Sequence, residues 1–284
     1  MMKKVEILVN LLKLLRWKNL LIVGVTQYAA AFFLIESLSI QSLLANLQML
    51  ILSISTVLIT ASGYVINDYY DVKIDYINKP DRVVVGRFLK RRSSIILHAW
   101  LNTIGLLLGT WVSWKIGVID FFAIGLLWLY SNQLKRLPLL GNIAVALLTG
   151  LAVFIVYIFF QQSVFLFAAY ATFAFFISLI REIIKDMEDV EGDRKFGCKT
   201  LPISIGIRKS KIVIYGISLV FIISVALLLQ HEPTFWWVFS GLVLMLGWLN
   251  YRLFKADKNK DFTNLSSLSK QIMILGLISM IFFK

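Results

Sequence analysis

Three aspartates stand at helical spacing in the segment NDYYDVKIDYINKPDR, residues 67–82. Asp68, Asp71 and Asp75 are separated by three and four residues, and a helix turns by about 100° per residue. The three carboxylates therefore share one helix face, within an arc of roughly 60°. A long apolar stretch precedes the segment, and carboxylates clustered at a membrane boundary are unfavourable unless a cation neutralises them. The spacing predicts a cation-binding face.

A second segment, KDMEDVEGD, repeats this spacing after another apolar stretch. Asp186, Asp189 and Asp193 are again three and four residues apart, and Glu182 lies one turn earlier on the same predicted face. Mg²⁺ prefers oxygen ligands and typically takes one or two carboxylates, several waters and phosphate oxygens of a substrate. Two such faces, rimmed by arginine and lysine, match a diphosphate held through bridging Mg²⁺ ions, which would neutralise charge on the leaving group.

An isoprenyl diphosphate has a matching shape, because its charged head suits the membrane interface and its hydrocarbon tail suits the space among apolar helices. A carbocation formed from such a substrate survives only where water is excluded, and an apolar helix bundle excludes water. The alternative is that the carboxylates pair with loop lysines and arginines as a solvated surface. Two motifs with the same spacing, at equivalent membrane depth, favour the metal site over this alternative.

The composition indicates an all-α polytopic membrane protein. The chain has 284 residues, of which 59% are hydrophobic and 16% charged, and its mean hydropathy is +0.80. A soluble protein of this size could not cover so much apolar surface. No long polar linker interrupts the chain, so residues 1–284 are expected to form a single integral-membrane domain. The net charge of +13 lies in short loops between apolar stretches, which points to membrane lipids and phosphate rather than to nucleic acid.

Nine transmembrane helices are predicted, preceded by an interfacial N-terminal helix within residues 1–18, where polar and apolar side chains occupy opposite sides. Apolar stretches of spanning length follow one another along the chain. They lie at 19–36, 43–66, 93–114, 117–134, 141–161, 163–183, 211–230, 235–254 and 265–283.

Basic residues alternate between the two ends of these predicted spans. The segment before the first span and the loops after the second, fourth, sixth and eighth are basic, whereas the opposite loops contribute only Lys115. Cytoplasmic loops carry the excess of lysine and arginine in membrane proteins. The alternation predicts that the N-terminus and both acidic motifs are cytoplasmic and, with nine spans, that the C-terminus lies outside.

The two acidic segments resemble the paired motifs of the UbiA superfamily of intramembrane prenyltransferases. Residues 67–82 are similar to the first motif of that superfamily, NDxxDxxxD, and KDMEDVEGDRKFGCKTLPISIG is similar to the second. LYSNQLKRLPLLGNIAVA, residues 129–146, is similar to the block that follows the fourth span. The resemblance implies a helical bundle around a central cavity, capped by cytoplasmic loops, that transfers a prenyl group from a polyprenyl diphosphate with Mg²⁺ as cofactor.

The resemblance also implies roles for individual residues. Lys135 would contact the diphosphate and take part in catalysis together with Asp71 and Asp189. The loop RVVVGR departs from many relatives, which have a proline after its first arginine. The implied metal ligands are Asn67, Asp68, Asp71 and Asp75 at the first site, and Asp186, Asp189 and Asp193 at the second. The implied diphosphate contacts are Arg16, Asn67, Arg82, Arg87 and Lys135.

The acceptor of the prenyl group is the remaining question. The string REIIKDMEDVEGDR, followed by TLPI, is most similar to digeranylgeranylglyceryl phosphate synthases, which alkylate the hydroxyl of a prenylglyceryl phosphate to form an ether lipid. Prenylation of an aromatic quinone-type or chlorophyll-type acceptor is the alternative. A transporter or binding protein for a phosphorylated lipid is the non-enzyme alternative. Transporters carry ionisable groups near the bilayer midplane, whereas the acidic residues here gather at one interface, which favours the enzyme.

One histidine lies within a predicted span. His98 and Asn102 are one turn apart on one face of the stretch 93–114. A hydrogen bond between helices is expected for this pair; a catalytic base is the alternative.

Overall fold

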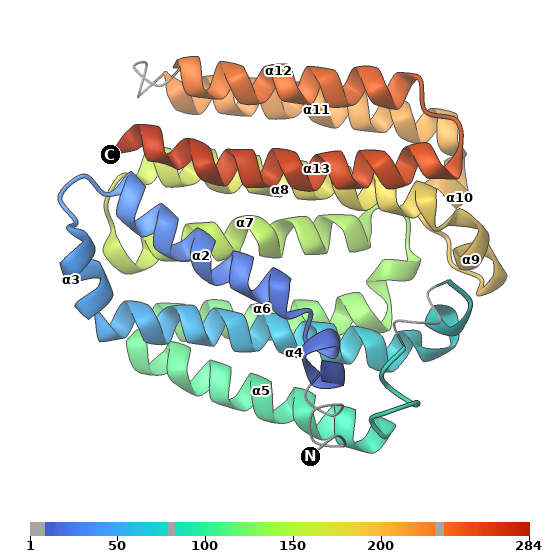
Figure 1. Cartoon of the computed structure of the whole chain (residues 1–284), viewed down its shortest axis with the longest axis horizontal. Coiled ribbons are helices and arrows are strands. Elements are labelled where there is room, and N and C mark those ends of the chain that lie inside the picture. The colour runs from blue at the N-terminus through green and yellow to red at the C-terminus, as the bar shows by residue number, and fades with distance from the viewer. Residues whose placement is uncertain (1–8, 79–82, 231–235) are drawn as a thin grey trace. The chain divides into compact units, whose positions relative to one another are not determined.

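The computed structural model describes residues 9–78, 83–230 and 236–284, and every regular element in these ranges is a helix (Figure 1). The first described helical residues are 9–14. The helices that follow are α2 (Trp17–Leu34), α3 (Ile40–Ala45), α4 (Leu47–Asn78), α5 (Arg91–Val112), α6 (Trp114–Asn132), the 3₁₀ helix η2 (Leu134–Arg136), α7 (Leu140–Phe160), α8 (Val164–Glu188), α9 (Val190–Lys195), α10 (Leu201–Ile205), α11 (Ile207–Leu229), α12 (Trp236–Phe254), α13 (Asn259–Ser279) and the 3₁₀ helix η4 (Met280–Phe283).

Eight of these helices are long and apolar enough to cross a membrane. The eight candidate spans are Leu47–Lys73, Arg91–Val112, Trp114–Asn132, Leu140–Phe160, Val164–Glu188, Ile207–Leu228, Trp236–Phe254 and Asn259–Phe283. They coincide with eight of the nine predicted spans. The other predicted span, 19–36, falls on α2, whose hydropathy is reduced by Lys18, Asn19 and Gln27, and α2 is not one of the eight.

Two boundaries differ from those predicted. The apolar stretch 43–66 is not one helix, because α4 begins only at Leu47, where the side chain of Asn46 accepts a hydrogen bond from the backbone N–H of Met49 at 3.0 Å and caps the helix. At its other end α4 continues to Asn78, so Asp68, Asp71 and Asp75 of the first motif all lie on one helix. By contrast, α8 ends at Glu188, and the second motif extends across the junction with α9.

The chain divides into two compact units. Unit 1 comprises Met1–Gln27 and Leu44–Leu134, and unit 2 comprises Tyr28–Leu43 and Lys135–Lys284. Unit 1 therefore carries the first acidic motif, and unit 2 carries Lys135 and the second acidic motif.

Polar side chains join the apolar helices of unit 1. In the buried interface of α4, α5 and α6, the Ser55 hydroxyl lies 2.6 Å from Oδ2 of Asp120. Closer to the acidic end, Nδ1 of His98 lies 3.1 Å from the backbone oxygen of Ser62, and the Ser62 hydroxyl donates to Asn102. These contacts join α5 to α4, so the predicted hydrogen bond between helices is confirmed.

A small apolar cluster anchors the segment that follows the first motif. Leu14, Val65, Val84 and Val85 are buried together, which ties the N-terminal helix and the loop at residue 83 onward to the end of α4. A tight turn then reverses the chain, and Gly86 (φ +87°) occupies a left-handed conformation that glycine adopts without strain. This packing determines where the loop lies relative to the first motif.

Unit 2 is built around α8, which packs against α7, α11 and α13. Most of its side chains from Leu166 to Met187 are buried. Gly276 of α13 allows the close approach of Phe173, because a Cβ at this position would overlap the phenylalanine ring. At the end of unit 2 opposite to the acidic motif, Nζ of Lys284 donates to the backbone oxygens of residues 35, 36 and 38.

Candidate active site

The first motif occupies the last turns of α4, where an arginine from another segment reaches it. Nη2 of Arg16 donates to Oδ1 of Asp68 at 2.9 Å, and the guanidinium carbon lies 4.7 Å from the centre of the Tyr64 ring. Asn67, Asp71 and Asp75 lie on the same helix, all half-buried. The sequence resemblance selected both Arg16 and Asp68, and the structure brings them together across 52 residues.

Arg16 lies at the junction between two helices. Its backbone adopts a left-handed conformation (φ +53°) between the N-terminal helix and α2, and its carbonyl accepts the N–H of Asn19 at 2.7 Å as α2 begins. Burial is the largest single influence on the pKa of the Arg16 guanidinium and lowers it, but Asp68, together with Tyr64, Tyr130 and Asp75, raises it by more, so the net direction is upward. Arg16 is therefore a permanent cation at the first motif.

A second arginine at the first motif was not selected from the sequence as a site residue. Arg91, the first residue of α5, donates from Nη2 to the backbone oxygen of Tyr69 at 3.3 Å, and its guanidinium lies 4.6 Å from the centre of the Tyr69 ring. In the sequence Arg91 was one of several basic residues of this loop. Only the packing of α5 against α4 distinguishes it from the others.

The capping loop is partly described. Arg87 lies on the exposed turn after Gly86, and its guanidinium lies 5.3 Å from the centre of the Phe88 ring. Its contacts within the described residues are therefore made to its own turn rather than to the acidic motif. Arg82, also a predicted diphosphate contact, lies outside the described residues.

In the second motif, a buried amide orients a carboxylate. Nδ2 of Asn142, near the start of α7, donates to Oδ2 of Asp186 on α8 at 2.8 Å. Asn142 is 7% exposed. It lies in the block 129–146 that resembled the family, yet it was not selected as a site residue. The signal available in the sequence was one amide in an otherwise apolar run.

One turn before Asp186, Glu182 is paired within its own helix. Its Oε1 accepts from Nη1 of Arg181 at 2.6 Å, and Nζ of Lys185 lies 3.6 Å from its Oε2. The Glu182 side chain is 10% exposed. Buried carboxylates are retained when cations compensate their charge, and here both cations come from α8 itself, one residue before and three residues after Glu182.

The second motif bends at Asp189, which corrects the prediction of a single straight helix face. Asp189 (φ −94°, ψ 6°) lies between the end of α8 at Glu188 and the start of α9 at Val190. Helical hydrogen bonds nevertheless continue through the bend, because Asp189 N–H donates to Lys185 and Asp193 N–H donates to Asp189, each at 3.0 Å. Asp186 therefore stands on α8 and Asp193 on α9.

The loop that carries Lys135 lies beside the end of the second motif. Lys135 is the middle residue of η2. The carbonyl of the next residue, Arg136, accepts the N–H of Lys199 at 2.8 Å, and the N–H of Cys198 donates to the carbonyl of Asp193 at 3.1 Å. Two backbone bonds thus connect the Lys135 loop, through Cys198 and Lys199, to the last aspartate of the motif.

The donors suit Mg²⁺ only if a substrate completes the coordination. Among the described residues, no group of three or more histidine, cysteine, aspartate or glutamate side chains is close enough to hold a metal ion. Mg²⁺ does not require such a group, because it typically keeps several waters and binds through one or two carboxylates and the phosphate oxygens of a substrate. The oxygen donors of both motifs and the orientation of Asp186 by Asn142 fit that mode.

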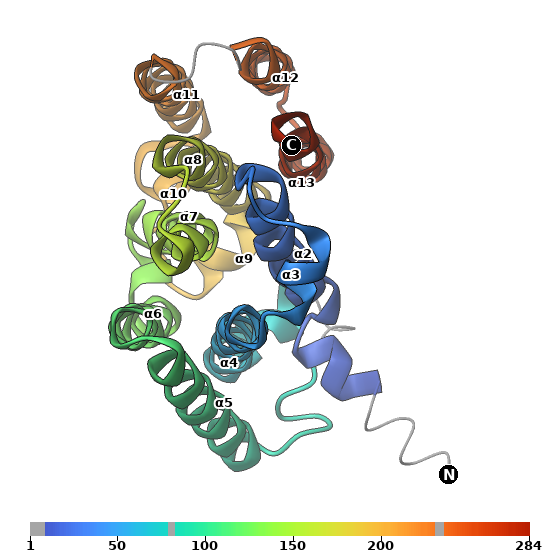
Figure 2. The same cartoon turned by 90° about the vertical axis from the view of Figure 1, so that its left-hand side faces the viewer.

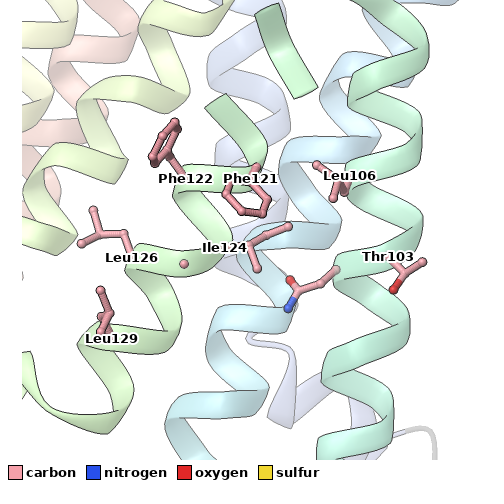
Figure 3. Close-up of a pocket in the computed structure, with 9 residues that line it drawn as sticks. Thr103, Leu106, Phe121, Phe122, Ile124, Leu126 and Leu129 are labelled. Carbon is pink, nitrogen blue, oxygen red and sulfur yellow. The ribbon is translucent and has the colours of Figure 1, made fainter. Parts of the chain in front are cut away.

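A cavity of about 540 Å³ in unit 1 lies apart from these residues. Figure 3 shows Leu106 of α5 and Phe121 and Ile124 of α6 pointing toward one another in it. None of the site residues predicted from the sequence lines the cavity. Its lining is mostly apolar, with Asn102 and Thr103 as its polar side chains, and it contains no basic residue to balance the charge of a diphosphate.

The Asn142–Asp186 contact leads to a prediction. Replacing Asn142 by alanine removes the donor that orients the carboxylate, so the apparent affinity for Mg²⁺ is expected to fall by about 10- to 100-fold, a typical cost of losing a group that supports a metal ligand. Activity measured against Mg²⁺ concentration tests this, with Thr149→Ala on the same helix as the matched control. An unchanged Mg²⁺ dependence in Asn142→Ala would contradict the assignment of Asp186 as a metal ligand.

Comparison with known families gives one model that covers most of the chain. Residues 19–269 match the model of the UbiA prenyltransferase family. The matched range includes the first motif, Lys135, Asn142 and the second motif, so the site described above lies wholly within it except for Arg16.

Similar curated proteins are named digeranylgeranylglyceryl phosphate synthase. The protein from Methanosphaera stadtmanae is 30% identical over 91% of this chain and 94% of its own length. The protein from Thermococcus gammatolerans is 42% identical over 54% of this chain and 55% of its own length. The chain therefore matches about half the length of the second relative and nearly all of the first.

Solved structures agree with this fold. A structure described as digeranylgeranylglyceryl phosphate synthase in membranes has a TM-score of 0.73 and 25% identity, and 98% of each chain is covered. A UbiA homologue from Archaeoglobus fulgidus bound to GPP and Mg²⁺ has a TM-score of 0.72 at 18% identity, with 95% of this chain and 99% of that chain covered.

Proposed function

Because this chain belongs to the UbiA prenyltransferase family, we propose that it transfers a geranylgeranyl group from geranylgeranyl diphosphate to geranylgeranylglyceryl phosphate. The observation that carries this proposal is the similarity to the Methanosphaera stadtmanae enzyme over 94% of the length of that enzyme. In the reaction, the bond between C1 of the prenyl chain and the diphosphate oxygen breaks. The acceptor hydroxyl oxygen bonds to C1, the hydroxyl proton is lost, and diphosphate leaves. The product is an ether lipid.

The two acidic motifs are proposed to bind one diphosphate through Mg²⁺. Asn67, Asp68, Asp71 and Asp75 would supply oxygen ligands at the first motif, and Asp186, Asp189 and Asp193 would supply them at the second. Bound Mg²⁺ would stabilise the negative charge that develops on the leaving diphosphate. A homologue bound to GPP and Mg²⁺ and the orientation of Asp186 by Asn142 support this assignment.

Basic side chains are proposed to hold the diphosphate directly. Arg16 can offer a planar fork of donors and Lys135 a mobile ammonium group. In the structure Arg16 donates to Asp68 at 2.9 Å. A bound Mg²⁺ would compete with Arg16 for the Asp68 carboxylate, and a bound phosphate would compete with Asp68 for the Arg16 guanidinium. Arg82 and Arg87, which are close in sequence to the first motif, are proposed as further contacts.

We also propose a ninth membrane span and an orientation of the protein in the membrane. We propose that α2 crosses the membrane as a ninth span, since its residues 20–34 are apolar except for Thr26 and Gln27. The N-terminus and both motifs would then be cytoplasmic and the C-terminus outside, in agreement with the alternation of basic loops. The bundle would enclose a central cavity for the prenyl chains, within one prenyltransferase domain over residues 1–284.

A panel of substrates tests the acceptor. Purified protein in detergent is incubated with geranylgeranyl diphosphate and with either geranylgeranylglyceryl phosphate or an aromatic quinone precursor, and the prenylated products are identified by mass spectrometry. We expect product only with the glycerol phosphate acceptor. Product with the aromatic acceptor alone would replace the proposal by the aromatic alternative, and binding of a phosphorylated lipid without any product would favour a transporter or binding protein.

The proposed diphosphate contacts can be tested by alanine substitution. Arg16→Ala and Lys135→Ala are each expected to lower kcat/KM for the prenyl diphosphate by about 10- to 100-fold, because each removes a charge-assisted hydrogen bond. Steady-state kinetics with the diphosphate varied and the acceptor saturating measure this. Lys18→Ala and Arg136→Ala, which remove neighbouring charges, are the matched controls. Equal effects in a variant and its control would mean that the substituted residue does not contact the diphosphate specifically.

Orientation can be tested by cysteine labelling. With Cys198 replaced by serine, a cysteine at Lys199 is expected to react with a membrane-impermeant thiol reagent only from the cytoplasmic side, and a cysteine at Lys115 only from the outside. Labelling of intact and opened cells measures the difference. Labelling of position 199 from outside would show that the proposed orientation is inverted.

A further inference from the structure

A polar groove runs between two helices of unit 2, away from the acidic motif residues. It has a volume of about 250 Å³ and is lined by Trp248 and Arg252 of α12 and, on α13, by Asn264, Leu265, Ser267, Leu268 and Gln271. Figures 1 and 2 both show α12 and α13 as neighbours along their lengths. Four of the side chains that line the groove can donate hydrogen bonds from an amide, a hydroxyl or a guanidinium.

These polar groups have no hydrogen-bond partners among the described residues. Asn264, Ser267 and Gln271 recur on one face of α13, within the candidate span Asn259–Phe283. Polar side chains at membrane depth are unfavourable unless something hydrogen-bonds to them. Since the described protein supplies no partner, water or a lipid headgroup from the surroundings must supply one.

The groove begins at the level of the second motif. Nδ2 of Asn259 donates to the backbone oxygen of Glu188 at 2.9 Å, and the hydroxyl of Thr263 donates to Oε1 of Glu188 at 3.0 Å. Glu188 is the last residue of α8, directly before Asp189. Asn264 follows Thr263, so the groove opens at the end of unit 2 that carries the motif and continues into the span along α13.

Aromatic and cationic side chains identify this level as the headgroup region of a bilayer. The rings of Trp248 and Tyr251 stack at 5.6 Å. The guanidinium of Arg252 lies 5.8 Å from the Trp248 ring, and Nζ of Lys255 lies 4.5 Å from the Tyr251 ring. Tryptophan, tyrosine, arginine and lysine gather where a membrane meets water, and basic grooves between spans bind anionic lipid headgroups.

The charge in the groove is available to a ligand. In the described part of the chain Arg252 forms no ion pair, and its electrostatic interaction with Asp261 is the smallest of those that act on this carboxylate. Asp261 already accepts backbone N–H groups from Asp257 at 3.1 Å and Lys258 at 2.9 Å. From these observations we propose that the groove between α12 and α13 binds the phosphate headgroup of one anionic membrane lipid. Arg252 binds the phosphate, Asn264 and Ser267 donate to phosphate or glycerol oxygens, and the lipid chains extend along the helices.

Native mass spectrometry of the full-length protein tests the site. The protein is titrated with phosphatidylglycerol and, separately, with phosphatidylcholine. We expect one phosphatidylglycerol molecule to bind at least about tenfold more tightly than phosphatidylcholine, and Arg252→Gln to weaken phosphatidylglycerol binding by about tenfold, the cost of one charge-assisted hydrogen bond. Asn264→Leu, which keeps the charge, should also weaken it. Arg208→Gln, the same change of charge on exposed α11, should bind like the wild type.

The following results would each contradict the proposal. An equal loss of binding in Arg208→Gln would indicate general surface attraction. Equal binding of the two lipids, or displacement of phosphatidylglycerol by inorganic phosphate, would exclude an anionic lipid site. The same spectra report oligomeric state, and a shift from dimer to monomer in Asn264→Leu with unchanged lipid binding would mean that a second copy of the chain covers the groove. None of these measurements depends on prenyl transfer, so the lipid site can be confirmed or refuted independently of the proposed reaction.

Discussion

Asp71→Asn and Asp189→Asn are each expected to abolish measurable turnover, a loss of at least about a thousandfold, while the protein stays folded. Asparagine has nearly the same size as aspartate but lacks its charge, so the substitution weakens a metal ligand without creating a cavity. Loss of several kcal/mol of charge stabilisation corresponds to this size of effect, since each 1.36 kcal/mol is a factor of ten in rate. Product formation under saturating substrates and Mg²⁺ measures the loss.

The control for these variants is Asp257→Asn, which makes the same chemical change in the loop between α12 and α13. The side chain of Asp257 is 90% exposed and lies 3.4 Å from Nζ of Lys211, and exposed ion pairs contribute little to stability. We expect wild-type turnover in this control. Near-normal turnover in Asp71→Asn or Asp189→Asn would mean that the corresponding motif is not a metal site, and circular dichroism in detergent would separate this result from unfolding.

Removal of Mg²⁺ is expected to have an effect of the same size. Chelation should abolish transfer, and added Mg²⁺ should restore it fully, because the proposed carboxylates and the diphosphate are otherwise all negatively charged. Ca²⁺ should restore much less, since it prefers more ligands at longer distances than the compact octahedral shell of Mg²⁺. Turnover measured after chelation and graded addition of each metal tests this expectation, and full activity in excess chelator would refute a metal-dependent mechanism.

A binding measurement complements the activity measurement. Geranylgeranyl diphosphate and Mg²⁺ together should raise the thermal unfolding temperature of the wild-type protein more than either alone, because a ligand that binds only the folded state stabilises it. The increase should be smaller in Asp71→Asn and Asp189→Asn, and unchanged in Asp257→Asn. An undiminished increase in the first two variants would show that the diphosphate and Mg²⁺ bind elsewhere.

Local patterns in the sequence are sufficient for most of the helical framework. Spanning helices satisfy all their backbone hydrogen bonds internally, so a long apolar run in a membrane has few other options. For this reason eight predicted spans coincide with candidate spans. The helical spacing of Asp68, Asp71 and Asp75 is a property of one continuous segment, and α4 contains all three. The type of each proposed metal ligand can likewise be read from the chemistry of carboxylates.

Boundaries were predicted less well, because they depend on single residues rather than on average hydropathy. The cap at Asn46 starts α4 later than the apolar stretch begins. The backbone conformation of Asp189 bends the second motif, although its spacing is the same as that of the first. Equal spacing along the chain thus produced one straight face and one bent face.

Only the tertiary structure decided which residues support the motifs. Arg16 meets Asp68 across 52 positions, and Asn142 meets Asp186 across 44. Arg91 was one basic loop residue among many until α5 placed it on Tyr69. Such contacts depend on how whole helices pack against each other, and helix packing is determined by the fit of many side chains at once. A pattern of three or four residues therefore identifies a carboxylate face, whereas the side chains that orient and neutralise it come from distant segments that packing brings together.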